Sequence, residues 1–309
     1  MANQALCVSG PVHAIYMINK YKVLLTKIRC RVCPGAYKRA LIKWAQQVGL
    51  KTPTLLLSFD CDTSRDAKAS LHVQRYLHKY GITAAFAVPG ELLDANWGDY
   101  SELLDLGAKF VNHGYRCHAE VDDKTGKPFS TFTYRDATDE VWKEDILLGH
   151  RLLTKLTGEE PQVFRTPHFG EFNSLKQLEN LYRYLSTLGY RVSSSTTPVF
   201  GVINGGAYSV APGLVELPLN GCLSKPTQLI DSWGFLSAPD ALGREKLVDE
   251  LGQYVQLFEK NVPVLLNLYF DPADIANEVE VLEALSKLSV GHSLGLDDRE
   301  VSSLAKNVM

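Results

Sequence analysis

Short apolar runs alternate with longer segments of helical periodicity along most of the chain. TLLLSF, residues 54–59, has the length and continuity of a strand buried on both faces of a sheet. Residues 64–81 then repeat apolar positions at helical spacing and end in glycine, a common helix stop. The same reading predicts further strands at 82–88, 108–112, 162–166, 190–195 and 262–270, extended segments at 215–219 and 228–234, and helices at 99–107, 139–158, 175–189, 241–261 and 278–291.

This alternation predicts an α/β fold built on a parallel sheet. About seven strand–helix units favour a closed or nearly closed barrel, in which function collects at the carboxyl ends of the strands. The residues after 291 are predicted to be a polar tail. We therefore divide the chain into an extension, residues 1–50, and a barrel, residues 51–309.

The extension differs from the barrel in charge. It holds eight Lys or Arg and no Asp or Glu, which leaves 24 basic and 35 acidic residues in the remainder. Residues 20–50 are predicted to form one or two amphipathic basic helices, broken near Pro34. Two interpretations stay open: an interfacial helix on an anionic membrane, involving residues 20–43, or a helix packed on the barrel with a solvated basic face.

The start of the chain does not resemble a signal peptide. It lacks a basic first region, and Pro11 and His13 interrupt its apolar stretch. No apolar run is long enough to span a membrane. We therefore expect a cytoplasmic protein, either free or peripheral on the inner face of the membrane, whose six cysteines are reduced thiols.

Acidic, imidazole and guanidinium side chains follow the expected strands. Imidazole together with carboxylate is the ligand set of catalytic zinc and related divalent ions. Such an ion lowers the pKa of bound water and polarises a carbonyl, and a nearby carboxylate can then deprotonate the water. The candidate site residues are Asp60, Asp62, His113, Tyr115, Cys117, His118, Arg165, His168, Asp231, Trp233 and Asp271.

Five phrases around these residues resemble, in order, the motifs of a known family. They are SFDCD, NHGYRCH, FRTPHFG, DSW and LNLYFDP, between about residues 54 and 275. The chain thus resembles the polysaccharide deacetylase superfamily (NodB-homology, carbohydrate esterase 4-like), nearest its peptidoglycan deacetylase and allantoinase-like branch. The resemblance implies a distorted (β/α)7 barrel, a divalent metal that is usually zinc, and hydrolysis of N-acetyl groups of amino sugars or of other amides.

The resemblance identifies the metal ligands in part. Asp62 and His113 take the first two ligand positions. The family usually spaces its ligand histidines His-x3-His, whereas here Cys117 holds the second position and His118 comes one residue later. Three outcomes stay open: the loop bulges so that His118 reaches the metal, Cys117 ligates instead, or only two protein ligands remain.

The resemblance also implies catalytic and binding roles. Asp60 takes the position of the catalytic base, and Arg165 that of the arginine that positions this base. Asp231 and Trp233 match a segment that orients a catalytic histidine and lines the acetyl pocket. We assign Tyr115, with Trp233, to substrate binding.

The general acid is the second departure from the family pattern. The family places a proton-donating histidine just before the proline of its last motif, where this chain has Asp271. An aspartate acts as an acid near neutral pH only if its surroundings raise its pKa. The acid is therefore either Asp271 with a raised pKa or His168; otherwise the protein hydrolyses amides poorly.

These features predict a metal-dependent amidohydrolase that removes an acetyl or similar acyl group from an amino sugar during surface polysaccharide biosynthesis. Two alternatives stay open: an allantoinase-like amidohydrolase of small cyclic or linear amides, and a catalytically impaired, deacetylase-like glycan-binding protein. The expected partners are a glycan or amino-sugar substrate, free or lipid-linked, and no nucleic acid.

Overall fold

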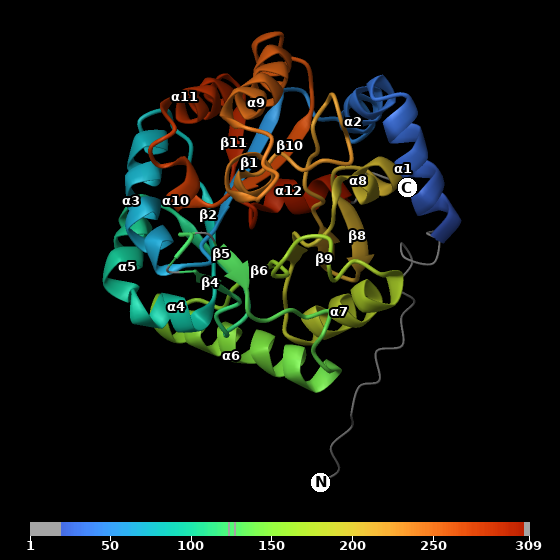
Figure 1. Cartoon of the computed structure of the whole chain (residues 1–309). Coiled ribbons are helices and arrows are strands. Elements are labelled where there is room, and N and C mark those ends of the chain that lie inside the picture. The colour runs from blue at the N-terminus through green and yellow to red at the C-terminus, as the bar shows by residue number, and fades with distance from the viewer. Residues whose placement is uncertain (1–19, 123, 127, 306–309) are drawn as a thin grey trace.

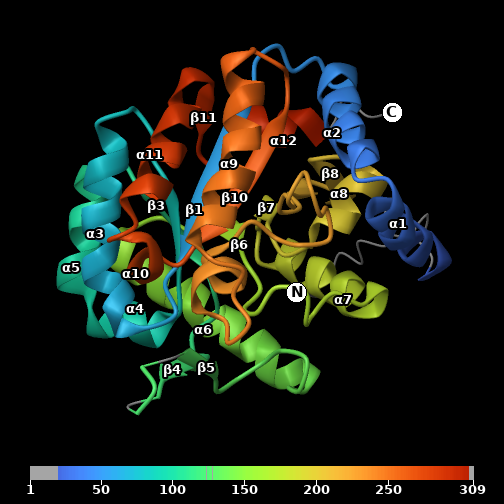
Figure 2. The same ribbon diagram turned by 45° about the horizontal axis from the view of Figure 1, so that its top comes forward.

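The computed structural model describes residues 20–122, 124–126 and 128–305. One curled sheet forms the centre of the molecule, and a separate two-stranded hairpin projects from it (Figures 1 and 2). The sheet contains β1 (Thr54–Asp60), β2 (Ala85–Val88), β3 (Lys109–Asn112), β6 (Val163–Phe164), β7 (Val192–Ser193), β8 (Tyr208–Ala211), β9 (Leu214–Glu216), β10 (Leu265–Phe270) and β11 (His292–Leu294); the hairpin contains β4 (Ala119–Val121) and β5 (Pro128–Ser130).

The strand order around the sheet is β10–β1–β2–β3–β6–β7–β9–β8, with β11 also beside β1. Neighbouring strands are parallel except β8 and β9, which form an antiparallel pair. Every residue of β1 and β10 is buried, as expected for strands with an apolar layer on both faces. The predicted α/β fold, with a mainly parallel sheet curled into a distorted barrel, is confirmed.

Helices surround the sheet (Figure 1). They are α1 (Lys20–Val32), α2 (Gly35–Gln47), α3 (Ser64–His78), α4 (Gly90–Ala95), α5 (Trp97–Asp105), α6 (Asp139–Thr157), α7 (Leu175–Thr187), α8 (Pro198–Asn204), α9 (Arg244–Glu259), α10 (Pro272–Ile275), α11 (Val279–Lys287) and α12 (Arg299–Leu304), with a π-turn, η2 (Trp233–Ser237), and a 3₁₀ turn, η3 (Leu288–Val290). No helix among the described residues is long and apolar enough to cross a bilayer.

The barrel closes between β9 and β10 without a ladder of strand hydrogen bonds. The chain after β9 runs beside β10, where the Asn220 amide donates to the carbonyl of Asn267 at 3.0 Å. In return, the Asn267 amide donates to the side-chain oxygen of Asn220 at 2.7 Å, and the Asn267 side-chain amide donates to the Leu217 carbonyl. A few asparagine contacts therefore close the ring.

The end of the chain is not the polar tail that the sequence predicts. β11 pairs with the first residues of β1, and α12 follows it. Leu296, Val301 and Leu304 are buried in one cluster with inward-facing strand residues such as Leu56 and Val163. The prediction was wrong because only these few apolar positions point inward, among many polar ones. The segment closes the end of the barrel opposite the strand carboxyl ends (Figure 1).

The expected extended segment at 228–234 is also largely absent. Gly221 and Leu229 form a single bridge, and from Trp233 the chain enters the π-turn η2. The backbone amide of Gly234 donates to the Asp231 carboxylate at 2.9 Å, which turns the chain at this point. Ile230 is buried, but Trp233 is exposed at the surface, so the segment is neither a strand nor a fully buried run.

Helix α2 packs against the barrel. Tyr37, Leu41 and Trp44 are buried, and the Tyr37 hydroxyl accepts a hydrogen bond from the Gly221 amide at 2.8 Å. Helix α1 instead buries only Cys30. Residues 20–50, for which the sequence predicts one or two helices, thus contain two, whereas a domain boundary at residue 51 stays a prediction. Pro11 and His13, on which the argument against a signal peptide rests, lie outside the described residues.

Candidate active site

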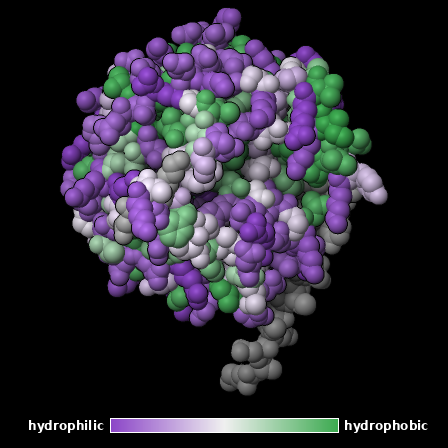
Figure 3. Space-filling model, viewed as in Figure 1, coloured by the Kyte–Doolittle hydropathy of each residue, from purple (hydrophilic) through white to green (hydrophobic). Residues whose placement is uncertain are grey.

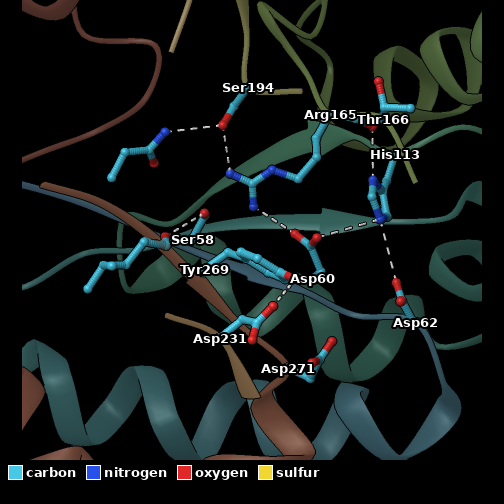
Figure 4. Close-up of polar contacts among 12 residues, drawn as sticks. Ser58, Asp60, Asp62, His113, Arg165, Thr166, Ser194, Asp231, Tyr269 and Asp271 are labelled. Carbon is cyan, nitrogen blue, oxygen red and sulfur yellow. Dashed lines mark hydrogen bonds and ion pairs between the residues drawn. The ribbon is translucent and has the colours of Figure 1, made fainter. Parts of the chain in front are cut away.

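The polar strand ends surround one pocket of about 520 Å³. Asp60 ends β1, and the chain after β3, β6 and β10 supplies further polar groups (Figure 4). Parallel strands bring their carboxyl ends to the same side, so segments distant in sequence meet there. Of the residues singled out from the sequence, Asp60, Asp62, His168, Asp231, Trp233 and Asp271 line the pocket.

Asp62, His113 and His118 are the group of the described residues whose geometry could hold a metal ion, and we call them the metal-binding group. Their ligand atoms lie within 4.8 Å of one another. Oδ1 of Asp62 is 2.9 Å from Nε2 of His118 and 3.5 Å from Nε2 of His113. Desolvation alone would raise the pKa of Asp62, but the charges and hydrogen bonds of the two histidines outweigh it and hold the pKa well below its usual value. An ionised carboxylate with two imidazoles is suited to a divalent ion.

The surroundings of the two histidines differ. Nδ1 of His113 lies 2.9 Å from the carbonyl of Arg165, to which it can donate. That bond leaves Nε2 as the lone-pair atom, which faces Asp62 and Asp60 (Figure 4). Nδ1 of His118 is buried and has no hydrogen-bond partner within the described residues. His113 is therefore held by a backbone carbonyl, whereas the ring of His118 contacts the Asp62 carboxylate and the rings of His113 and His168.

A bulged loop brings His118 to this group despite the extra residue. The loop starts at Gly114, which has φ of +83° and whose amide donates to the Asn112 side chain at 3.0 Å. A side chain here would meet the Asp145 carboxylate at 2.2 Å, so the position requires glycine. Of the three outcomes left open by the sequence, the geometry favours the one in which the loop bulges and His118 approaches Asp62.

Two acidic side chains hold the bulge from outside. Asp145 of α6 accepts from the Arg116 amide at 2.8 Å and from the Tyr134 hydroxyl. Glu91 of α4 accepts from the Cys117 amide at 2.7 Å. Cys117 packs against the barrel core and is not a member of the metal-binding group. These contacts position the loop between His113 and His118.

Asp60 and Arg165 form a buried ion pair next to the metal-binding group. Nη1 of Arg165 donates to Oδ1 of Asp60 at 2.7 Å, and Nη2 donates to the Ser194 hydroxyl at 3.1 Å (Figure 4). The other Asp60 oxygen, Oδ2, is 3.9 Å from Nε2 of His113. Asp60 therefore has one oxygen held by the guanidinium and one directed toward the metal-binding group.

Asp231 lies on the other side of the pocket. It accepts from the Tyr269 hydroxyl at 2.9 Å and from the Gly234 amide. The family pattern implies that this acid orients a histidine, but its hydrogen-bond partners here are a tyrosine and the backbone. Its structural role among the described residues is to hold η2, and with it Trp233, at the rim of the pocket.

Asp271 follows β10 and faces the pocket. The Ser232 hydroxyl donates to its carboxylate and accepts from its backbone amide at 2.6 Å. Desolvation raises the pKa of Asp271 well above its usual value, and the nearby charges of Asp62, Asp274 and Asp66 raise it further. A carboxylic acid with a raised pKa can carry a proton near neutral pH.

His168 is directed toward the backbone that flanks the hairpin on either side. Its φ of 55° is left-handed, and Nε2 lies 3.2 Å from the His118 carbonyl and 3.1 Å from the Phe132 carbonyl. Desolvation lowers the pKa of His168, and the charge of His118 lowers it further. Because Nε2 must carry its hydrogen to satisfy a carbonyl, His168 is less suited than Asp271 to give a proton to substrate.

Tyr115 lies apart from the pocket. Its ring packs against Gly90 of α4, where an added side chain would meet it at 2.6 Å. Its assignment to substrate binding stays a prediction. Conversely, the sequence reading missed Phe129 and Ser130 of the hairpin and Tyr269 of β10. Tyr269 lies within the phrase LNLYFDP, so the family motif could have pointed to it. Phe129 and Ser130 lie in a three-residue strand, which is too short to show a periodic pattern.

Residues 35–192 match the family model described as polysaccharide deacetylase. The chain belongs to this family, as its motifs indicate. The solved structures it resembles include a polysaccharide deacetylase-like protein from Mycobacterium smegmatis, with 14% identity over 77% of this chain and 84% of that one and a TM-score of 0.57. No curated protein matches the chain.

Two more solved structures have the same fold. Puue allantoinase is 12% identical over 77% of this chain and 83% of its own, with a TM-score of 0.56. A probable polysaccharide deacetylase from Pseudomonas aeruginosa PAO1 is 13% identical over 76% and 83%, with a TM-score of 0.55. At these identities the likenesses establish the fold and do not distinguish between amide substrates.

Proposed function

We propose that the protein is a metal-dependent amidohydrolase that removes an acetyl or similar acyl group from an amino sugar. The observation that carries this proposal is the position of the Asp60–Arg165 pair beside the group of Asp62, His113 and His118. A carboxylate held at one oxygen, next to a three-ligand group with room for water, is the arrangement that amide hydrolysis needs.

Asp62, His113 and His118 would hold a divalent ion, and zinc is the ion that two imidazoles and one carboxylate suit best. When bound, the ion supplies polarisation of the amide carbonyl and lowers the pKa of water toward neutrality. The chain supplies the base: Oδ2 of Asp60 accepts the proton of the attacking water. Arg165 fixes the orientation of Asp60 through Oδ1.

Amide cleavage also requires a proton on the leaving nitrogen, because an amide anion is a poor leaving group. Asp271 is our candidate donor, because its pKa is raised and it faces the same pocket. The Ser232 hydroxyl fixes the carboxyl group of Asp271. Asp231 contributes by holding the η2 turn, and His168 supports the hairpin and the His118 carbonyl.

Two exposed aromatic side chains support a sugar substrate. Trp233 and Phe129 both line the pocket, and they are 43% and 46% exposed. They come from different elements, η2 and the hairpin, so a chain-like substrate can contact both. An aromatic ring beside a polar pocket offers the apolar face on which a sugar ring stacks. We propose a glycan or amino-sugar substrate, free or lipid-linked, of surface polysaccharide biosynthesis.

The direct test is acetate release from N-acetylglucosamine oligosaccharides by zinc-loaded protein, with allantoin as a second substrate. We expect acetate from the oligosaccharides and at least a 100-fold loss in Asp60→Asn, because general base catalysis contributes about 10²–10⁴-fold. Asp240→Asn, an exposed acid, is the matched control. Hydrolysis of allantoin alone would favour the small-amide alternative. Oligosaccharide binding without hydrolysis of either substrate would favour the glycan-binding alternative.

A further inference from the structure

Helix α1 presents a continuous apolar row to solvent. Five of the twelve large apolar side chains that are exposed among the described residues lie on this one helix. They are between 48% and 80% exposed and comprise Tyr21, Leu24, Leu25, Ile28 and Val32. Their spacing of three, four and seven residues places them on one face. Figure 3 shows the apolar surface that gathers at the right-hand edge, over α1.

The opposite face of α1 is the one that contacts the barrel. Cys30 is buried, and Val23 packs against the core cluster that includes Phe200 of α8. At about 100° per residue, these two positions lie roughly opposite Leu25 and Ile28. The apolar row is therefore not the packing face of the helix, and none of the described residues covers it.

Basic side chains line both edges of this apolar row. At the same angular spacing, Lys20, Lys27 and Arg31 fall along one edge, and Lys22 and Arg29 along the other. All five are exposed, and α1 contains no acidic residue. An apolar row between two basic edges suits the surface of an anionic lipid layer. The row can enter the boundary of the acyl chains, and the basic side chains on both edges can reach the anionic headgroups.

We propose that α1 is an interfacial helix by which the protein docks on an anionic lipid surface. The helix would lie in the plane of the surface, with its apolar row in the acyl boundary and its basic edges at the headgroups. The inference does not depend on the proposed amidohydrolase activity, because no residue of α1 lines the pocket.

The dimensions of the row argue against a second copy of this chain as the partner. A 13-residue helix is about 20 Å long, and its exposed face is about 10 Å wide. Such a face is much smaller than the roughly 800 Å² per partner of a stable protein interface. Residues 51–309 carry more acidic than basic residues, so an anionic surface repels the barrel and leaves α1 as the point of contact.

The test is co-sedimentation of the full-length protein with vesicles of phosphatidylglycerol and phosphatidylcholine, compared with vesicles of phosphatidylcholine alone. We expect partitioning to the anionic vesicles that falls with added salt. Leu25→Gln/Ile28→Gln should weaken it about 100-fold, or tenfold per side chain. Lys27→Gln/Arg31→Gln should weaken it about 25-fold, or fivefold per charge.

The matched controls change two exposed apolar residues or two exposed basic residues on the barrel. Val279→Gln/Val290→Gln and Lys246→Gln/Lys260→Gln should partition like the unaltered protein. Equal partitioning of the two α1 variants and the controls would overturn the proposal, as would a failure of the unaltered protein to bind anionic vesicles. A lipid-free dimer that Leu25→Gln/Ile28→Gln converts to monomer would assign the row to a second copy and overturn it as well.

Discussion

Arg165 and Asp60 are 105 residues apart in sequence, yet their side chains meet at 2.7 Å. Both residues are buried, so neither charge is compensated by bulk water. A buried ion pair contributes little net stability compared with a well-packed apolar pair, but removal of one partner leaves the other charge uncompensated. The pair therefore makes the stability of the barrel sensitive to a residue that we propose for catalysis.

We predict that Arg165→Ala lowers the free energy of unfolding by about 3–5 kcal/mol, because Asp60 then remains buried without its cation. Urea unfolding measures the change. Arg135→Ala is the control: Arg135 forms ion pairs with Asp136 and Glu171 on the surface, and exposed pairs contribute at most about 1 kcal/mol. Similar losses in the two variants would mean that the burial of the Asp60–Arg165 pair has no special effect.

We predict that His113→Ala and His118→Ala abolish stoichiometric zinc binding, whereas Cys117→Ala and the exposed His72→Ala retain it. Metal analysis after dialysis against buffered zinc tests this. Zinc at 100 times its Kd should also raise the unfolding free energy of the unaltered protein by about 2.7 kcal/mol, and should not stabilise His113→Ala. Loss of zinc in Cys117→Ala together with retention in His118→Ala would transfer the third ligand to the thiol.

We predict an alkaline limb in the pH–rate profile that belongs to Asp271. The donor must carry its proton, so activity is present below the raised pKa of Asp271 and is lost as the pH rises through it. Asp271→Asn should remove the limb and lower kcat by about 10²–10⁴-fold. Asp271→His should keep the activity, with a limb near the usual histidine pKa of about 6.5. If Asp271→Asn kept the same alkaline limb in its pH–rate profile, Asp271 would not be the general acid, and His168 would be the next candidate.

We predict that Leu296→Ala lowers the free energy of unfolding by about 3 kcal/mol, because it opens a cavity where the C-terminal segment closes the barrel. Thermal or urea unfolding can measure this. Val290→Ala is the control, since Val290 is 64% exposed, and surface changes usually stay within about 0.5 kcal/mol. If Leu296→Ala left the free energy of unfolding unchanged, residues 292–305 would contribute as little to stability as the polar tail that the sequence predicts.

The sequence predicted the parts of the fold that depend on local patterns. Long apolar strands such as β1 and β10, and amphipathic helices such as α3 and α6, lie where periodicity placed them. Because the site residues directly follow these strands, the pocket could be anticipated as well. The hairpin of β4 and β5, the strand β8 and the segment from β11 to α12 were missed, because they lie outside the strand–helix alternation that located equally short strands such as β6 and β7.

The third metal-ligand position could not be decided from the sequence. Whether His118 or Cys117 faces Asp62 depends on the path of the loop, which Asp145 and Glu91 hold from two separate helices. Such contacts join residues some 25 to 30 positions apart and leave no local pattern. The raised pKa of Asp271 likewise arises from acids brought together by tertiary structure.

The asparagine closure between β9 and β10 is a seam with less regular pairing than the β1–β10 ladder. β1 pairs with β10 over six residues, whereas this seam relies on Asn220, Asn267 and a few backbone contacts. We therefore expect this seam to open before β1 separates from β10, so that amides on either side of it exchange with solvent before those of β1. The Asn267 side chain also donates to Ser194, which in turn accepts from Arg165. Opening of this seam would therefore loosen Arg165 and, with it, the proposed catalytic base Asp60.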